Sequence, residues 1–89
     1  MLRNGALTGK TVVDLSRMLP GPYCSMILAD HGARVIAVED KRFADDPFFV
    51  SAVYRNKEHM TLNLKSEKGL EVFQGLVQKA DVLIEGFRP

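Results

Sequence analysis

Hydrophobic and polar residues alternate in blocks along the 89-residue chain. Two longer segments, 22–31 and 66–80, carry apolar residues at spacings of three and four, which predicts amphipathic helices. Short runs rich in aliphatic and β-branched residues are typical of strands buried in a sheet. Four such runs occur, at 11–15, 34–38, 59–64 and 81–85. Strands that alternate with helices in this way predict the α/β class.

The first predicted helix has recognisable limits. Pro22 suits its first turn, because a residue there needs no backbone N–H, and Gly32 suits the position just after its end. Tyr23, Met26, Ile27 and Asp30 recur at helical spacing, which supports a helix over this segment. With the strands on either side, this helix predicts a right-handed crossover unit between two parallel strands.

The second predicted helix begins after Ser66, which is a favourable N-cap residue, and Glu67 favours the helix dipole in the first turn. Its apolar positions predict one stripe facing the sheet, composed of Leu70, Phe73, Leu76, Val77 and Ala80. Between the second and third strands, residues 48–54 are apolar-rich and predict a short helical turn.

Together these elements predict a three-layer Rossmann-like open sheet of about four mostly parallel strands with crossover helices. A doubly wound domain usually has more strands, so we expect residues 1–89 to form a partial domain. No internal repeat or low-complexity linker divides the chain.

Composition narrows the function classes. The chain is 46% hydrophobic and 26% charged with a net charge of +1, which gives no general electrostatic reason to bind nucleic acid. Its apolar runs are shorter than the ~18–20 residues that span a bilayer, so we expect no membrane insertion. The single cysteine, Cys24, has no intrachain disulfide partner, which fits a reducing cytoplasm.

The segment after the first strand is the main candidate for ligand binding, because loops at the carboxyl ends of parallel strands bind ligands in α/β proteins. An acid at the end of the second strand, Glu39, is compatible with a ribose contact from NAD. That interpretation needs a G-x-G-x-x-G turn, whereas the segment has one glycine, Gly21, and bulky neighbours. A P-loop motif is absent, and His31 and His59 lack metal-ligand spacing, so we expect no metal site.

Several segments carry a family resemblance. The run Asp-Leu-Ser-Arg-Met-Leu-Pro-Gly-Pro-Tyr-Cys at 14–24 resembles the N-terminal signature of the family III CoA-transferases. That family includes formyl-CoA and carnitine CoA-transferases and α-methylacyl-CoA racemase. The similarity continues through Leu-Ala-Asp-His-Gly-Ala-Arg-Val-Ile-Ala-Val-Glu at 28–39 and Arg-Asn-Lys at 55–57. It then covers Thr-Leu-Asn-Leu-Lys at 61–65 and Ala-Asp-Val-Leu-Ile-Glu-Gly-Phe-Arg-Pro at 80–89.

The resemblance implies a coenzyme A site at the carboxyl ends of the strands, with CoA or acyl-CoA as a substrate and no tightly bound cofactor. Cations would meet the phosphates of CoA and apolar side chains would meet its adenine. The candidate binding residues are Arg17, Met18, Leu19, Lys41, Arg42, Lys57, Leu62, Asn63 and Lys65. Arg55 and Arg88 are further cations near predicted loops.

Three positions depart from the family pattern. Asp40 follows the strand-two glutamate, where many members have arginine, and Glu58 follows Asn56-Lys57, where a basic residue is usual. Gly86 replaces an asparagine before Phe87. We expect Asp40 and Glu58 to weaken the binding of a phosphorylated ligand.

No catalytic residue is predicted within the chain. The resemblance implies that transferases of the family use a downstream aspartate as nucleophile, and that racemases use a downstream histidine and aspartate. Asp14 matches neither role and is predicted to shape the turn after the first strand. We therefore expect the N-terminal part of a CoA-transferase or acyl-CoA racemase, inactive alone, acting as a homodimer or with the rest of a longer chain. The alternatives are a stand-alone CoA- or nucleotide-binding module and a self-associating module without catalysis.

Overall fold

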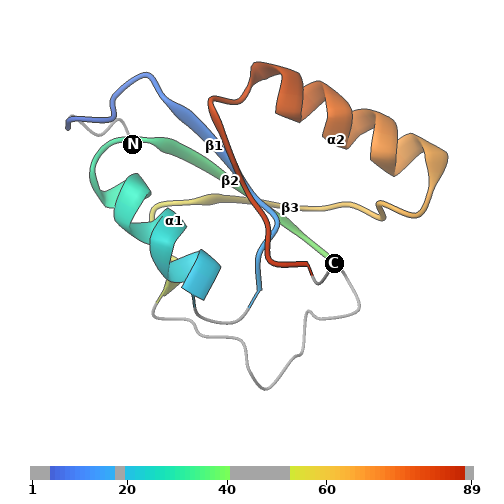
Figure 1. The fold of residues 1–89 in the computed structure, drawn as a ribbon, viewed down its shortest axis with the longest axis horizontal. Coiled ribbons are helices and arrows are strands. Elements are labelled where there is room, and N and C mark those ends of the chain that lie inside the picture. The colour runs from blue at the N-terminus through green and yellow to red at the C-terminus, as the bar shows by residue number, and fades with distance from the viewer. Residues whose placement is uncertain (1–4, 18–19, 41–52, 88–89) are drawn as a thin grey trace.

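The computed structural model describes residues 5–17, 20–40 and 53–87, and its elements alternate between strand and helix (Figure 1). The strands are β1 (Thr11–Asp14), β2 (Arg34–Glu39), β3 (Glu58–Thr61) and β4 (Val82–Ile84), and the helices are α1 (Pro20–Asp30) and α2 (Glu67–Lys79). All the strand pairs are parallel, and the sheet order is β3-β2-β1-β4. This order matches the first four strands of the Rossmann order 3-2-1-4-5-6, so the predicted α/β fold is confirmed.

Side chains alternate between the two faces of the sheet and form two separate cores. One core lies under α1 and contains Val12, Ala29, Ala33 and Val35, with Leu7, Leu28 and Ile84 packed against it. The other lies under α2 and contains Val13, Ile36 and Val38, with Leu15, Met60, Leu62, Phe73, Leu76 and Ala80 packed against it. Figure 1 shows the two helices on either side of the diagonal run of strands. The sheet is therefore the middle of three layers.

α1 differs from its prediction in its start. It begins at Pro20 and not at Pro22, and both prolines fit because N–H groups of the first turn have no intrahelical partner. Its buried residues are Ser25, Met26 and Ala29, while Tyr23 and Ile27 are exposed. Of the apolar residues at helical spacing, Met26 faces the sheet together with the small residues Ser25 and Ala29. Gly32 has a φ of +102°, which confirms it as the stop after the helix.

α2 largely follows its prediction. Ser66 is the N-cap, and its Oγ accepts a hydrogen bond from the backbone N–H of Gly69 at 2.9 Å. Phe73 and Leu76 pack on the sheet as expected, but Leu70 is 42% exposed, so the predicted stripe is buried only in part.

β3 spans Glu58–Thr61, whereas the pattern predicted residues 59–64. The chain leaves the strand because Asn63 begins a turn. Its side-chain Oδ1 accepts a hydrogen bond from the N–H of Lys65, and its carbonyl accepts one from the N–H of Ser66. A side chain that bonds to nearby backbone competes with the ladder of the sheet. Most of the helical turn predicted at 48–54 lies outside the described residues.

Candidate functional site

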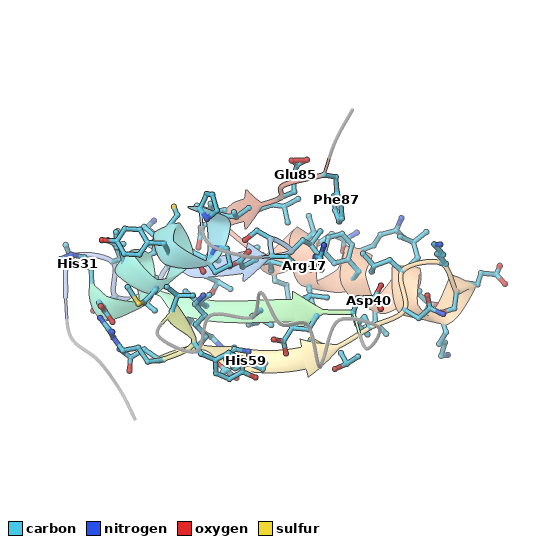
Figure 2. All side chains as sticks on the ribbon, turned by 90° about the horizontal axis from the view of Figure 1, so that it is seen from below. Arg17, His31, Asp40, His59, Glu85 and Phe87 are labelled. Carbon is cyan, nitrogen blue, oxygen red and sulfur yellow. The ribbon has the colours of Figure 1, made fainter. Side chains whose placement is uncertain are left out.

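Four of the predicted ligand contacts follow strands at the carboxyl edge of the sheet, namely Arg17 after β1 and Leu62, Asn63 and Lys65 after β3. Asp14 pairs with Ala37 on one side and Ile84 on the other, so β1, β2 and β4 end close together. Figure 2 shows Arg17, Asp40 and Phe87 toward this carboxyl edge, and His31 at the opposite end of the fold. This is the edge where open α/β sheets bind their ligands.

The carboxylate of Asp14 organises the first of these loops from inside the protein. Its residue is 2% exposed. One oxygen, Oδ1, accepts hydrogen bonds from the backbone N–H of Ser16, at 2.7 Å, and from the hydroxyl of Ser16. The other oxygen, Oδ2, accepts a hydrogen bond from the hydroxyl of Ser25 in α1. The predicted role of Asp14 in shaping the turn is confirmed. The sequence did not indicate that Asp14 also binds α1 through Ser25.

Lys57 completes this internal cluster. Its side chain is 3% exposed, and its Nζ donates a hydrogen bond of 2.9 Å to the carbonyl of Pro22. The same Nζ lies 3.8 Å from Oδ2 of Asp14. Burial lowers the pKa of the Lys57 ammonium, and the negative charge of Asp14 is the largest of the influences that oppose this effect. We call the group formed by Asp14, Ser25 and Lys57 the buried polar cluster.

Two glycines lie beside Ser16 in the first loop, and only one of them is required by a close contact. A Cβ added to Gly21 would lie 2.0 Å from Oγ of Ser16, so any side chain there would push Ser16 away from Asp14. A Cβ on Gly86 would lie 4.0 Å from the Cβ of Ser16, which is an ordinary contact. Gly86 therefore leaves room for a side chain beside Ser16.

The turn between β3 and α2 holds three more of the predicted contacts, Leu62, Asn63 and Lys65. Leu62 packs into the core under α2, and its N–H donates to the carbonyl of Glu39. Oδ1 of Asn63 is engaged in the turn, so a hydrogen bond from Asn63 to a ligand would come from its NH₂ group. Lys65 is exposed. Gly69 lets α2 approach this turn, because a Cβ there would lie 2.0 Å from the carbonyl oxygen of Asn63.

His59 lies beside this edge on the α1 face of β3 and is held by its neighbours. Its ring stacks on Tyr54 with 3.5 Å between centroids, and its Nε2 lies 3.2 Å from the carbonyl of Tyr54. Its Nδ1 lies 3.4 Å from a carboxylate oxygen of Glu39. Burial and the charge of Glu39 raise the pKa of Tyr54. These contacts fix the end of β2 against β3.

Not all of the predicted cations reach the carboxyl edge. Arg55 and Asn56 bind the carboxylate of Asp30, with 2.8 Å from Nη2 of Arg55 to Oδ2 and 2.6 Å from Nδ2 of Asn56 to Oδ1. Lys57 reaches into the protein below α1. Four candidate contacts lie outside the described residues, namely Met18, Leu19, Lys41 and Arg42. Arg88 lies outside them too.

Glu58 should repel an anionic ligand less than the sequence suggested, because its charge is paired within the protein. Its carboxylate binds Arg34, with 2.6 Å between Oε1 and the Nε of Arg34, at the amino end of β2. This hydrogen bond is the main reason that the pKa of Glu58 is lowered. Asp40 does lie toward the ligand edge (Figure 2).

Sequence reasoning did not identify Ser25. Its hydroxyl is fully buried on the face of α1 that meets the sheet, where an apolar residue is usual. The sequence offered one signal, a serine within a helix expected to pack on the sheet. A buried hydroxyl needs an internal hydrogen-bond partner, which here is Asp14.

An open pocket of about 630 Å³ lies at the opposite edge of the sheet, lined by residues that include Lys10, Gly32, Arg34 and Asn56. Its place at the amino ends of the strands separates it from the loops described above. Within 5–17, 20–40 and 53–87, no cluster of three or more His, Cys, Asp or Glu side chains suits a metal ion. No helix in these same ranges is long and apolar enough to cross a membrane.

Comparison with known proteins identifies one family. The sequence model described as CoA-transferase family III matches residues 7–89. The chain is 45% identical to human alpha-methylacyl-CoA racemase over 83 residues, which cover 93% of this chain and 21% of that protein. It is 42% identical to acetyl-CoA:oxalate CoA-transferase of Acetobacter aceti over 96 residues, covering 96% of this chain and 25% of that protein.

Solved structures agree with the sequence comparison. A CAIB/BAIF family protein from Brucella suis superposes with a TM-score of 0.84 and 34% sequence identity, over 96% of this chain and 26% of that one. The chain thus spans about a quarter or less of the length of these relatives.

Proposed function

Because the chain belongs to CoA-transferase family III, we propose that its carboxyl edge forms the N-terminal part of a site for coenzyme A and its acyl thioesters. The observation that supports this most strongly is that Arg17 follows β1 and the β3–α2 turn follows β3, so both come after strands that end at the carboxyl edge of one parallel sheet. Coenzyme A presents phosphates that need cations and an adenine that needs apolar contact. Arg17, Lys65 and the NH₂ group of Asn63 are suitable donors.

The predicted contacts from Met18, Leu19, Lys41, Arg42 and Leu62 belong to the same proposal. A longer protein of this kind would act as a CoA-transferase or an acyl-CoA racemase in the cytoplasm. Of the two relatives compared above, one is named as an alpha-methylacyl-CoA racemase and the other as an acetyl-CoA:oxalate CoA-transferase. Both activities handle acyl-CoA, so the proposed ligand is common to them.

Isothermal titration of the chain with coenzyme A tests the site. In this proposal Lys65 contacts a phosphate of coenzyme A. The variant Lys65→Met should therefore bind roughly tenfold or more weakly, which is the loss expected for one charge-assisted hydrogen bond. Lys10→Met is the matched control, because Lys10 is exposed at the opposite edge of the sheet and should leave affinity unchanged. Equal losses in both variants, or no binding by the parent chain at millimolar ligand, would contradict the proposal.

We further propose that the 89 residues alone do not turn over thioesters. Asp14 is the acid most central to the site, but both of its oxygens already accept hydrogen bonds inside the protein. A carboxylate held in this way is poorly placed to attack a substrate. An assay with a panel of acyl-CoA compounds should therefore give only the background rate. Turnover that disappears in Asp14→Asn would contradict this expectation.

A second candidate function is self-association as a homodimer, which the outer edge of β4 favours. β4 is the last strand of the sheet, and Val82 and Leu83 are each 43% exposed. An uncovered strand edge with apolar side chains favours pairing with further polypeptide. In a longer protein, a strand following β4 in doubly wound order would take this place.

Sedimentation equilibrium shows whether the edge of β4 pairs two copies of the chain. If β4 is the contact, the chain should dimerise and Leu83→Lys should make it monomeric. Ile27→Lys is the control, since Ile27 is a comparably exposed apolar residue on α1. A monomeric parent chain would exclude self-association and leave the ligand proposal intact.

A further inference from the structure

Lys57 joins three elements that are distant in the sequence. It precedes β3, its ammonium binds a carbonyl of the first turn of α1, and it lies 3.8 Å from the carboxylate at the end of β1. Lysine usually keeps its ammonium in water while its stem lies on apolar surface. With 3% of its side chain exposed, Lys57 does the opposite.

Burial of an ammonium is costly unless polar partners replace water. The carbonyl of Pro22 and the carboxylate of Asp14 supply such partners, and Glu39 adds a further negative charge nearby. A phosphate contact by Lys57 would require its ammonium to leave these partners. The contacts therefore indicate a role inside the protein.

The effect of the buried polar cluster extends to the ligand edge through Asp14. The carboxylate oxygen that faces away from Lys57 holds both the N–H and the hydroxyl of Ser16. Ser16 in turn fits against Gly21, where a Cβ would lie 2.0 Å from its Oγ. Arg17, the candidate cation of this loop, is the next residue.

We infer that Lys57 is a positioning residue, which fixes Asp14 and the first turn of α1 and so sets the conformation of residues 15–17 and 20–22. This inference replaces direct phosphate contact as the role of Lys57. Its consequence for binding rests on the proposed coenzyme A site, but its conformational part does not need a ligand.

NMR spectra of the ¹⁵N-labelled chain without ligand test the conformational part. Lys57→Met keeps the length of the stem and removes the charge. It should shift the amide resonances of Ser16, Arg17 and Gly21, which are remote from residue 57 in sequence. Lys65→Met, at the other loop of the edge, should leave these three resonances in place. Unchanged resonances in folded Lys57→Met would overturn the inference.

Titration with coenzyme A at low and high salt tests the consequence for binding. A lysine that touches phosphate contributes to the salt dependence of affinity, because exposed charges are screened. Lys65→Met should therefore bind with a weaker salt dependence than the parent chain. Lys57→Met should lose affinity and keep the parent's salt dependence. If the salt dependence falls as much in Lys57→Met as in Lys65→Met, Lys57 is a direct contact and the inference is wrong.

Ser25→Ala provides a second route if Lys57→Met does not fold. It removes one donor to Asp14 but leaves Asp14 and Lys57 paired, and should shift the same three amides by a smaller amount. Unchanged amides in this variant would count against the cluster as a positioning device. If the parent chain binds no coenzyme A, the proposed ligand is wrong, while the ligand-free spectra still decide the role of Lys57.

Discussion

Beside its apolar core, the contact between α1 and the sheet includes a carboxylate, two serine hydroxyls and an ammonium, whereas on the other face α2 packs Phe73 and Leu76 against aliphatic strand residues. Apolar packing tolerates small shifts, because it has no directional bonds. Hydrogen bonds to a buried carboxylate fix atoms in place, and they are costly to leave incomplete. The polar side borders the first ligand loop, so geometry is defined most strictly where the proposed ligand would bind.

The largest effect is expected on the polar face. Asp14→Ala leaves the ammonium of Lys57 without its carboxylate, and removal of one partner of a buried ion pair costs about 3–5 kcal/mol. Total stabilities of small domains are about 5–15 kcal/mol, so urea unfolding should show a greatly weakened fold. The double variant Asp14→Leu, Lys57→Met should recover part of this loss, since neither charge then remains buried. A loss below about 1 kcal/mol in the single variant would mean that the cluster contributes little.

On the apolar face, the strongest test is the approach of α2 to the β3–α2 turn. Gly69→Ala places a Cβ against the carbonyl oxygen of Asn63, at 2.0 Å, and that oxygen belongs to the backbone. Overpacking of this kind costs about 1–3 kcal/mol. The matched control is Gly75→Ala in the same helix, where a Cβ meets no atom within 4 Å. It should stabilise the chain by up to about 1 kcal/mol, because alanine favours helix. Equal thermal shifts in both variants would refute the steric explanation.

A smaller effect is expected at the start of α2. Ser66→Ala removes the hydroxyl that accepts from the N–H of Gly69 and donates to the carbonyl of Asn63. Loss of an N-cap typically costs about 1 kcal/mol. Ser66→Asn keeps a side-chain acceptor and should retain most of the stability in denaturant unfolding. The explanation by capping fails if alanine and asparagine give the same result.

The smallest effect is the pH dependence that Lys57 adds to stability. Its pKa in the folded protein is lowered from the ordinary 10.5, mainly by burial. The unfolded chain therefore holds this proton more tightly, and the free energy of unfolding should rise with pH between the folded pKa and 10.5. Lys57→Met should lack this contribution when both chains are unfolded in urea at several pH values. If the free energy of unfolding varies with pH in the same way in the parent chain and the variant, Lys57 makes no such contribution.

The contrast between the faces also explains what the sequence could predict. α2 followed from local signals, because its cap and apolar stripe lie within one stretch of chain. The buried polar cluster did not, since it combines residues from β1, α1 and the segment before β3. Lys57 looked like an exposed cation beside a loop, and nothing local indicates that its side chain turns inward.

The candidate site, like the fold, could be predicted only in part from the sequence. Parallel strands implied a common carboxyl edge, and the family resemblance identified the loops that reach it. The end of β3 was wrong by several residues because hydrogen bonds of Asn63 terminate the strand, and periodicity does not reveal such competition. The direct ligand roles of Arg17, Asn63 and Lys65 stay predictions until binding is measured.

The strand order has a consequence for how the chain folds during synthesis. β1 is an inner strand, yet one of its two neighbours, β4, is the last strand of the described chain to be made. Until the ribosome has released Val82–Ile84, one side of β1 presents unpaired backbone groups, and such an edge is open to wrong pairing. Folding of β1, β2 and β3 can precede this step, but these four strands form one sheet only when β4 docks beside β1.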